Sequence, residues 1–245
     1  MTSYRLRQNI TVPTIELSFK TSKTLNFSDT VRLRGFISRI FSNNILLHNH
    51  DNESLRYSYP RVQYKVIDSH AIVLGLAEGI EALKPLAQLN RIVIGHEDIH
   101  IDDFEIIEDK SPLGILSNHQ PYSFLTPWLA LNEKNYEKYQ KLGTWAKKKE
   151  LLESILIGNI ISMSKSLGYT VPEPIKANII SLKEVQTKLK GTPMLGFLGT
   201  FSVNFSIPDY WGIGKSVSRG FGTIKRTDNK TTDHQTDRQQ KIENR

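Results

Sequence analysis

The chain has 245 residues, which suits one large domain or two of ordinary size, and it carries a formal net charge of +7 at pH 7. Cysteine is absent, which excludes disulfide bonds, thiolate metal sites and a cysteine nucleophile. No apolar run approaches the roughly 18 residues of a membrane span, and no apolar signal segment follows Met1. We expect a cytoplasmic protein whose basic excess favours an acidic partner, either nucleic acid or an anionic surface.

The first half of the chain predicts the element order β-α-β-β-α-β. Apolar residues alternate over 15–19, and a helical spacing covers 30–41, with Ser28 as its N-cap. Further strands are expected over 56–67, 71–75, 91–94 and 99–107, with a helix over 78–89 that Pro85 interrupts. This order is typical of a ferredoxin-like domain, in which two helices cover one sheet face and the other face stays free.

Two histidines, His48 and His50, stand one residue apart in an Asn-rich and Asp-rich stretch after the first helix. If this stretch is extended, both rings point to the same side. The residues alone leave three interpretations open: a polar surface run, a metal site without an obvious third ligand, and a pair of acid–base groups. The more distant His96 and His100 are interpreted as surface or structural residues.

The strand expected over 56–67 alternates apolar residues with basic and aromatic ones. Val62, Tyr64 and Val66 face one way, and the opposite face carries Tyr57, Tyr59, Arg61, Gln63 and Lys65. Aromatic and basic groups on one face suit stacking on bases and pairing with phosphates. Arg32 and Arg39 share one side of the preceding helix and are further candidates for contact with RNA.

A linker is expected over 111–121, followed by a second α+β unit. Asn132 can cap a helix over 133–142, and a longer helix over about 145–167 begins with the basic run Lys147 to Lys149. Strands are expected over 175–182 and 197–205, with Lys188 and Lys190 between them. We therefore expect domains over 1–115 and 116–225, and a disordered tail over 226–245 that holds too few apolar residues for a core.

A glycine-rich stretch, Gly212-Ile-Gly-Lys-Ser-Val-Ser-Arg-Gly-Phe-Gly222, closes the second unit. Glycine lets backbone N–H groups approach an anion, and Lys215 and Arg219 add positive charge. The stretch fails as a P-loop because Asp209 stands where glycine is required, and it fails as a dinucleotide fingerprint because of Val217. It is therefore either a loop that binds a phosphodiester backbone or a glycine-rich hairpin without a ligand.

These residues together resemble the CRISPR-associated repeat-processing endoribonucleases, the sixth Cas protein family. The family pattern is Gly-hydrophobic-Gly, five variable residues with a basic one among them, then Gly-hydrophobic-Gly, and residues 212–222 match it position by position. The family also places a catalytic histidine after the first helix, where His48 and His50 stand, and this chain resembles a branch with His-x-His. The resemblance covers roughly residues 28 to 224 and implies two tandem ferredoxin-like (RRM-like) domains.

The resemblance implies cleavage of CRISPR precursor RNA within each repeat, without metal or cofactor, to leave 2′,3′-cyclic phosphate and 5′-OH ends. It implies that His48 and His50 share the proton transfers while Lys65 and Tyr57 act on the scissile phosphate. The residues expected to hold RNA are Arg32, Arg39, Arg61, Lys188, Lys190, Gly212, Gly214, Lys215, Ser216, Ser218, Arg219, Gly220 and Gly222. In this interpretation the glycine-rich stretch holds the RNA rather than cuts it.

Two alternatives to this enzyme use the same residues. The first is a non-catalytic subunit that binds CRISPR repeat RNA, in which the histidines are incidental. The second is a protein-interaction subunit of a larger ribonucleoprotein, with Lys147 to Lys149 and the tail as docking elements. The expected partner is repeat RNA, with a multisubunit CRISPR effector complex as a further one, and the oligomeric state is a monomer or a homodimer.

Overall fold

The computed structural model of the chain describes residues 9–42, 45–48 and 58–227, so most of the expected tail lies outside it. The strands are β1 (Asn9–Thr21), β2 (Val62–Ile67), β3 (His70–Leu76), β4 (Arg91–Ile94), β5 (Glu97–Phe124), β6 (Ala177–Leu189), β7 (Thr192–Ser206) and β8 (Ile224–Arg226). The helices are α1 (Asp29–Ile40), α2 (Ile45–His48), α3 (Gly79–Leu83), α4 (Glu133–Lys141) and α5 (Trp145–Ser166), with 3-10 turns η1 (Lys84–Gln88) and η2 (Val217–Arg219). No helix in this described part is long and apolar enough to cross a bilayer.

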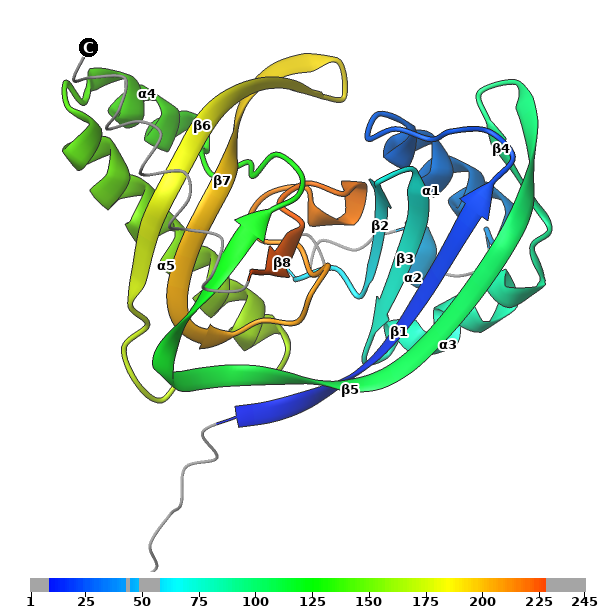
Figure 1. The fold of residues 1–245 in the computed structure, drawn as a ribbon, viewed down its shortest axis with the longest axis horizontal. Coiled ribbons are helices and arrows are strands. Elements are labelled where there is room, and N and C mark those ends of the chain that lie inside the picture. The colour runs from blue at the N-terminus through cyan, green and yellow to red at the C-terminus, as the bar shows by residue number, and fades with distance from the viewer. Residues whose placement is uncertain (1–8, 43–44, 49–57, 228–245) are drawn as a thin grey trace, which may run out of the picture.

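One long strand, β5, belongs to both halves of the molecule and runs along the bottom of the view in Figure 1. Its first part pairs with β1 and its last part pairs with β7 and β8, all antiparallel. The prediction of a linker over 111–121 is therefore wrong, because those residues continue the strand β5. Ser111 and Pro112 pair with Val12 and Thr11. The polar residues between Ile115 and Gln120, which suggest a loop in the sequence, lie in a bulge of the strand.

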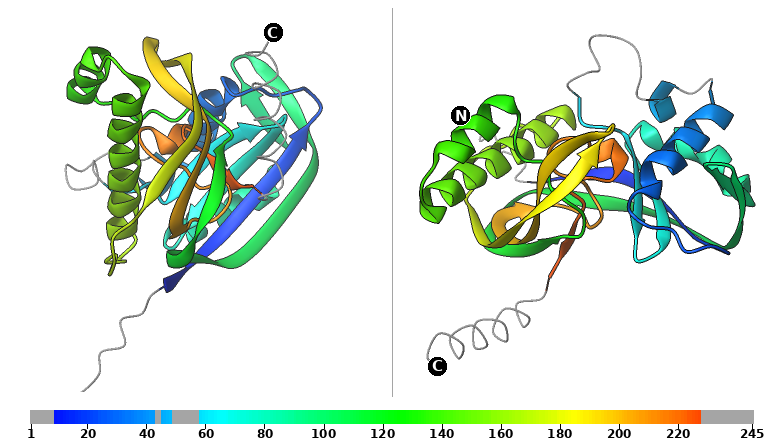
Figure 2. Two further views of the ribbon diagram at one scale, coloured as in Figure 1. Left: turned by 60° about the vertical axis from the view of Figure 1, so that its left-hand side comes forward. Right: turned by 90° about the horizontal axis from the view of Figure 1, so that it is seen from above.

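The two halves form ferredoxin-like arrangements within one continuous sheet, and they share β5. The strand order β2-β3-β1-β5 in the first half and β6-β7-β5-β8 in the second half matches the βαββαβ pattern. The tandem α+β architecture expected from the sequence is confirmed. The helices of the two halves stand at opposite ends of the molecule (Figure 2), and in the second half the short turn η2 stands where a full second helix would be.

The first half packs its helices on one sheet face, as the apolar spacing predicts. Leu33 and Ile37 of α1 are fully buried in one core with Tyr64 and Val73 of the sheet. A second core forms around α5, where Leu152, Leu156 and Ile160 pack with the aromatic residues of β7, Phe197, Phe201 and Phe205. The helix expected over 78–89 is short, because α3 gives way at Lys84 to a 3-10 turn that contains Pro85.

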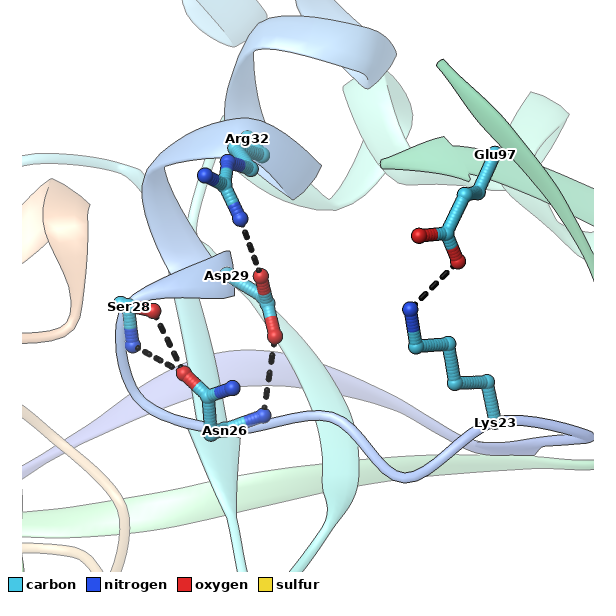
Figure 3. Close-up of polar contacts among 6 residues, drawn as sticks. All are labelled: Lys23, Asn26, Ser28, Asp29, Arg32 and Glu97. Carbon is cyan, nitrogen blue, oxygen red and sulfur yellow. Dashed lines mark hydrogen bonds and ion pairs between the residues drawn. The ribbon is translucent and has the colours of Figure 1, made fainter. Parts of the chain in front are cut away.

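The start of α1 differs from the expected side-chain cap. Ser28 occupies the N-cap position, but its Oγ donates to Asn26 Oδ1 and caps no helical amide (Figure 3). Asp29 instead accepts from the backbone N–H of Asn26 through Oδ2 at 3.1 Å, and Arg32 Nη1 contacts Asp29 Oδ1 at 3.0 Å. An ion pair between Lys23 and Glu97 fastens the entry loop to β5 (Figure 3).

The free face of the first sheet is covered by the second half of the chain. Gln63 and Lys65, expected on an open basic face, are fully buried, and Tyr59 is 9% exposed. Gln63 Oε1 accepts from the Gly212 N–H at 3.1 Å and from Lys65 Nζ at 2.9 Å. Tyr59 Oη donates to the Gly212 carbonyl at 2.8 Å. These bonds dock the first glycine of the glycine-rich stretch onto β2, so the interpretation of this face as an open stacking surface is wrong for Tyr59.

Lys65 supplies a test of this docking. Burial, partly offset by Glu16, lowers the pKa of Lys65 to about 7 from 10.5. The unfolded chain therefore binds one more proton above pH 7, and wild-type stability should rise between pH 7 and 9 by up to about 1.4 kcal/mol per pH unit. We expect Lys65→Met to lose this rise in the free energy of unfolding, measured in urea, while the exposed Lys183→Met keeps it. Equal slopes for wild type and Lys65→Met would show that Lys65 is not buried as described.

Candidate functional site

The glycine-rich loop, residues 212–222, folds back on itself between β7 and β8. The Ile213 N–H donates to the Gly222 carbonyl at 2.8 Å, so the two Gly-hydrophobic-Gly segments lie side by side. Gly222 has φ +64, and a Cβ added there would stand 1.9 Å from the Ile213 carbonyl oxygen. At Gly214, with φ +92, an added Cβ would stand 2.6 Å from the Trp128 indole nitrogen. The glycines are therefore required by backbone conformation and close packing.

A cavity of about 320 Å³ opens on the basic insert of this loop. Its walls come from three parts of the chain: the loop itself, the second half of α5, and the residues that enter β2. They are Ser58 to Pro60, Asn159, Ser162, Met163 and Ile213 to Arg219. Lys215 is exposed and Arg219 is half-buried. Hydroxyl groups, backbone amides and two cations around a small opening suit a phosphate group.

The other side of the loop packs against α1. A Cβ at Gly220, where φ is +84, would lie 2.9 Å from Thr30 Cγ2 and 3.0 Å from the Tyr64 carbonyl oxygen. Thr30 is fully buried, and its Oγ1 has no hydrogen-bond partner among the described residues. Only a residue without a side chain at position 220 lets η2 approach α1 this closely.

Two arginines meet at this contact, one from each half of the chain. Arg34 lies on α1 and is 8% exposed, and Arg219 ends η2. Burial, and then the positive charge of Arg219, lower the pKa of Arg34, and burial lowers the pKa of Arg219. Like charges held together favour an anion beside them. Arg34 could not be identified from the sequence as a site residue, because it lies next to Leu33 on the apolar side of the helix. Its position near Arg219 appears only in the fold.

Helix α2 ends beside the same contact. The Leu47 carbonyl accepts from Ser38 Oγ at 2.8 Å and from Tyr64 Oη at 3.4 Å. His48 is the last residue of α2, and its side chain, like His50 and Tyr57, lies outside the described residues. His48 therefore directly follows Leu47, which is hydrogen-bonded to the Tyr64 side chain. The backbone carbonyl of Tyr64 in turn lies next to Gly220. The catalytic roles of His48, His50 and Tyr57 stay predictions.

The other basic residues named from the sequence have separate places. Arg61 Nη2 donates to the Ser166 carbonyl and Arg61 Nε contacts Glu78, so this side chain ties the start of β2 to the end of α5. The Lys65 ammonium reaches Gln63 and does not line the cavity. Direct contact of Lys65 with RNA would require this interface to open. The catalytic role of Lys65 and the contact of Arg61 with RNA stay predictions.

Four further cations expected at the RNA lie away from the cavity lining. Arg32 contacts Asp29, and Arg39 is exposed in the last turn of α1. Lys188 and Lys190 are exposed at the tip of the β6–β7 hairpin, where Lys190 and Gly191 both have positive φ. This two-residue turn has the conformation of a type I′ hairpin. The contacts of these residues with RNA stay predictions.

The lysine run at the start of α5 is engaged with neighbouring side chains. Thr144 Oγ1 caps the helix by accepting from the Lys147 N–H. Lys148 Nζ lies 4.5 Å from the centre of the Tyr139 ring, and Lys149 Nζ donates to Asn178 Oδ1 at 3.0 Å. These contacts give two of the three lysines a structural use. In the described part of the chain, no three histidine or carboxylate side chains are grouped to hold a metal.

The glycines of the loop can be tested by substitution. Gly222→Ala should destabilise the protein by clearly more than Gly191→Ala, because both positions have positive φ but only Gly222 lacks space for a methyl group. The conformational strain common to both is on the order of 1 kcal/mol, and the overlap with Ile213 adds to it at Gly222. Urea unfolding of the two variants measures the difference. Equal losses would mean that close packing does not constrain the loop.

Comparisons with known proteins identify relatives along nearly the whole chain. The family models of the Cas6b N-terminal and C-terminal domains match residues 10–111 and 114–227. A Methanocaldococcus jannaschii protein named only as uncharacterized is 44% identical over 149 residues, which are 61% of this chain and 95% of that protein.

Two solved structures also match. A crystal structure of Cas6b superimposes with a TM-score of 0.83 at 37% identity and covers 89% of this chain and all of the other. A crystal structure described as the CRISPR RNA processing endoribonuclease Cas6b gives a TM-score of 0.71 at 35% identity, over 88% of this chain and 100% of that one. The resemblance to the sixth Cas protein family is confirmed, and the chain belongs to the Cas6b family. Its membership of a branch with His-x-His stays a prediction.

Proposed function

We propose that this protein is a metal-independent endoribonuclease that cuts CRISPR precursor RNA within its repeats. The related Cas6b described as a CRISPR RNA processing endoribonuclease supports the class of reaction. The observation that carries the proposal for this chain is the meeting of the two halves. The glycine-rich loop of the second half packs on α1 and β2 of the first half, beside the helix that ends at His48.

In the proposed reaction the ribose 2′-oxygen attacks the adjacent phosphorus. A base removes the proton from the 2′-OH, the bond from phosphorus to the 5′-oxygen breaks, and an acid protonates that oxygen. The products are a 2′,3′-cyclic phosphate and a 5′-OH end. Histidine, with an unperturbed pKa near 6.5, can serve in either role near neutral pH. His48 and His50 are the groups that we assign to these two transfers.

The phosphate is held, in this proposal, by cations from both halves. Arg34 and Arg219 stand together in a partly desolvated place, where a guanidinium binds phosphate more strongly than it does in open water. The polar cavity lined by Lys215, Ser216 and Ser218 would hold a neighbouring part of the backbone. The loop thus binds RNA, and its cations stabilise the charge that develops on the phosphate.

A cleavage assay in chelator tests the proposal. Wild-type protein incubated with the repeat RNA of its own locus in excess EDTA should give one cut per repeat with a cyclic phosphate end. A 2′-deoxy substitution at the scissile nucleotide should block the cut, because it removes the nucleophile. The double variant His48→Ala/His50→Ala should slow single-turnover cleavage by at least about 100-fold, the lower range for proton-transfer catalysis. His96→Ala/His100→Ala is the matched control and should keep wild-type rates.

Three results would count against the enzyme. Cleavage that EDTA abolishes would contradict the metal-independent reaction, and full activity of His48→Ala/His50→Ala would remove the histidine assignment. Tight binding of repeat RNA without any product would favour the non-catalytic RNA-binding subunit. Gel separation of end-labelled products, with acid treatment to open the cyclic phosphate, distinguishes these outcomes.

A further inference from the structure

A second and larger groove, of about 890 Å³, lies beside the glycine-rich loop. It is bounded by the start of α4 on one side and by the β6–β7 hairpin on the other. Its lining residues are Leu131 to Lys134, Tyr136, Gln140, Glu184, Gln186, Pro193 to Leu195 and Lys215. Lys215 also lines the small cavity of the loop, so the groove and the cavity have this lysine in common.

The chemistry of this groove differs from that of the small cavity. Tyr136 is 46% exposed, and apolar side chains such as Leu131 and Met194 lie with the amides of Gln140 and Gln186. An exposed aromatic ring next to amide groups suits the flat face and the polar edge of a nucleobase. The small cavity, by contrast, is rich in hydroxyl groups and cations and suits a phosphate.

The charges along the groove also suit nucleobases in the groove and phosphate in the small cavity. Glu133 and Lys134 oppose each other in sign, and Glu184 accepts from Tyr139 Oη at 2.7 Å with Lys148 Nζ at 3.9 Å. The acidic and basic side chains of the lining therefore nearly balance. Lys215, which the groove shares with the small cavity, is a further cation of the lining. At the hairpin, Lys188 lies on the same face of β6 as Glu184 and Gln186 and pairs with Pro193.

We propose that this groove binds unpaired nucleobases of the repeat RNA next to the cut, with a base stacked on Tyr136 and the backbone passing from Lys215 toward Lys188. The inference rests on the proposed function for the identity of the RNA. It adds a base-binding subsite to the phosphate contacts of the loop. It also gives Lys188, expected from the sequence to touch RNA, a position on a continuous track.

A second protein is the competing occupant of such a groove. RNA is favoured because the groove and the small polar cavity share Lys215, and Lys188 adds a second cation beside the groove at Pro193. The β6–β7 hairpin also places Lys190 just beyond Lys188, so positive charge extends past the end of the groove. A protein partner would make no use of this continuity.

Binding of uncleavable repeat RNA, 2′-deoxy at the scissile nucleotide, tests the subsite over a series of salt concentrations. Tyr136→Ala should raise Kd about 10-fold with an unchanged salt dependence, because stacking carries no counterion release. Tyr136→Phe should retain wild-type affinity, since the ring remains. Lys188→Ala should lower the slope of log K against log salt by about 0.7, the value for one phosphate contact on a single strand. Lys183→Ala, an exposed lysine earlier on β6, should leave that slope unchanged.

Crosslinking of RNA that carries 4-thiouridine gives a second readout. A crosslink in residues 131–140 or 184–195 supports the subsite, and crosslinks confined to other segments overturn it. Wild-type binding by both Tyr136→Ala and Lys188→Ala also overturns it, and a change in oligomeric state alone would assign the groove to a protein partner. Cleavage of repeat RNA by the wild type distinguishes failure of the subsite from failure of the proposed function. If the wild type cleaves normally and the groove variants bind RNA as well as it does, the subsite is rejected and the proposed endoribonuclease is retained.

Discussion

The contact between the Gln63 carboxamide and the Gly212 N–H is the interaction on which the site depends. It joins β2 of the first half to the loop of the second half, and Tyr59 closes the same contact from the Gly212 carbonyl. Both partners are buried, so loss of either bond would leave a buried polar group without its partner. The contact fixes where the loop begins, and the glycines then determine how closely η2 can approach α1.

The site combines features that cost stability. The loop requires positive φ at several residues, Lys65 is buried with its pKa lowered to about 7, and the half-buried Arg219 lies near the buried Arg34. Strained backbone and buried charge of this kind concentrate at functional sites. A phosphate bound beside the two arginines would relieve their mutual repulsion, so the same charges that weaken the free protein favour the bound one.

Much of the fold could be predicted from the sequence, because alternation and helical spacing reflect local burial. The strand containing Val62, Tyr64 and Val66 and the helix capped by Asn132 follow their patterns. The pairing of the halves could not be predicted, because burial of Gln63 and Lys65 depends on a loop about 150 residues later. Pro112 and its polar neighbours led to the prediction of a linker. Pairing with β1 and a bulge instead keep these residues in β5. The position of Arg34 near Arg219 could not be predicted either, since the two arginines are distant in the chain.

The central claim is that the two halves bind one phosphate together, and a double-mutant cycle tests it directly. Binding of uncleavable repeat RNA would be measured for Arg34→Ala, Arg219→Ala and the double variant, with Arg91→Ala, an exposed arginine of β4, as the control. We expect strong coupling: each single substitution weakens binding, and the second adds much less once the first is present. Additive losses in the double variant would contradict it, because they would mean that the two arginines act on separate parts of the RNA.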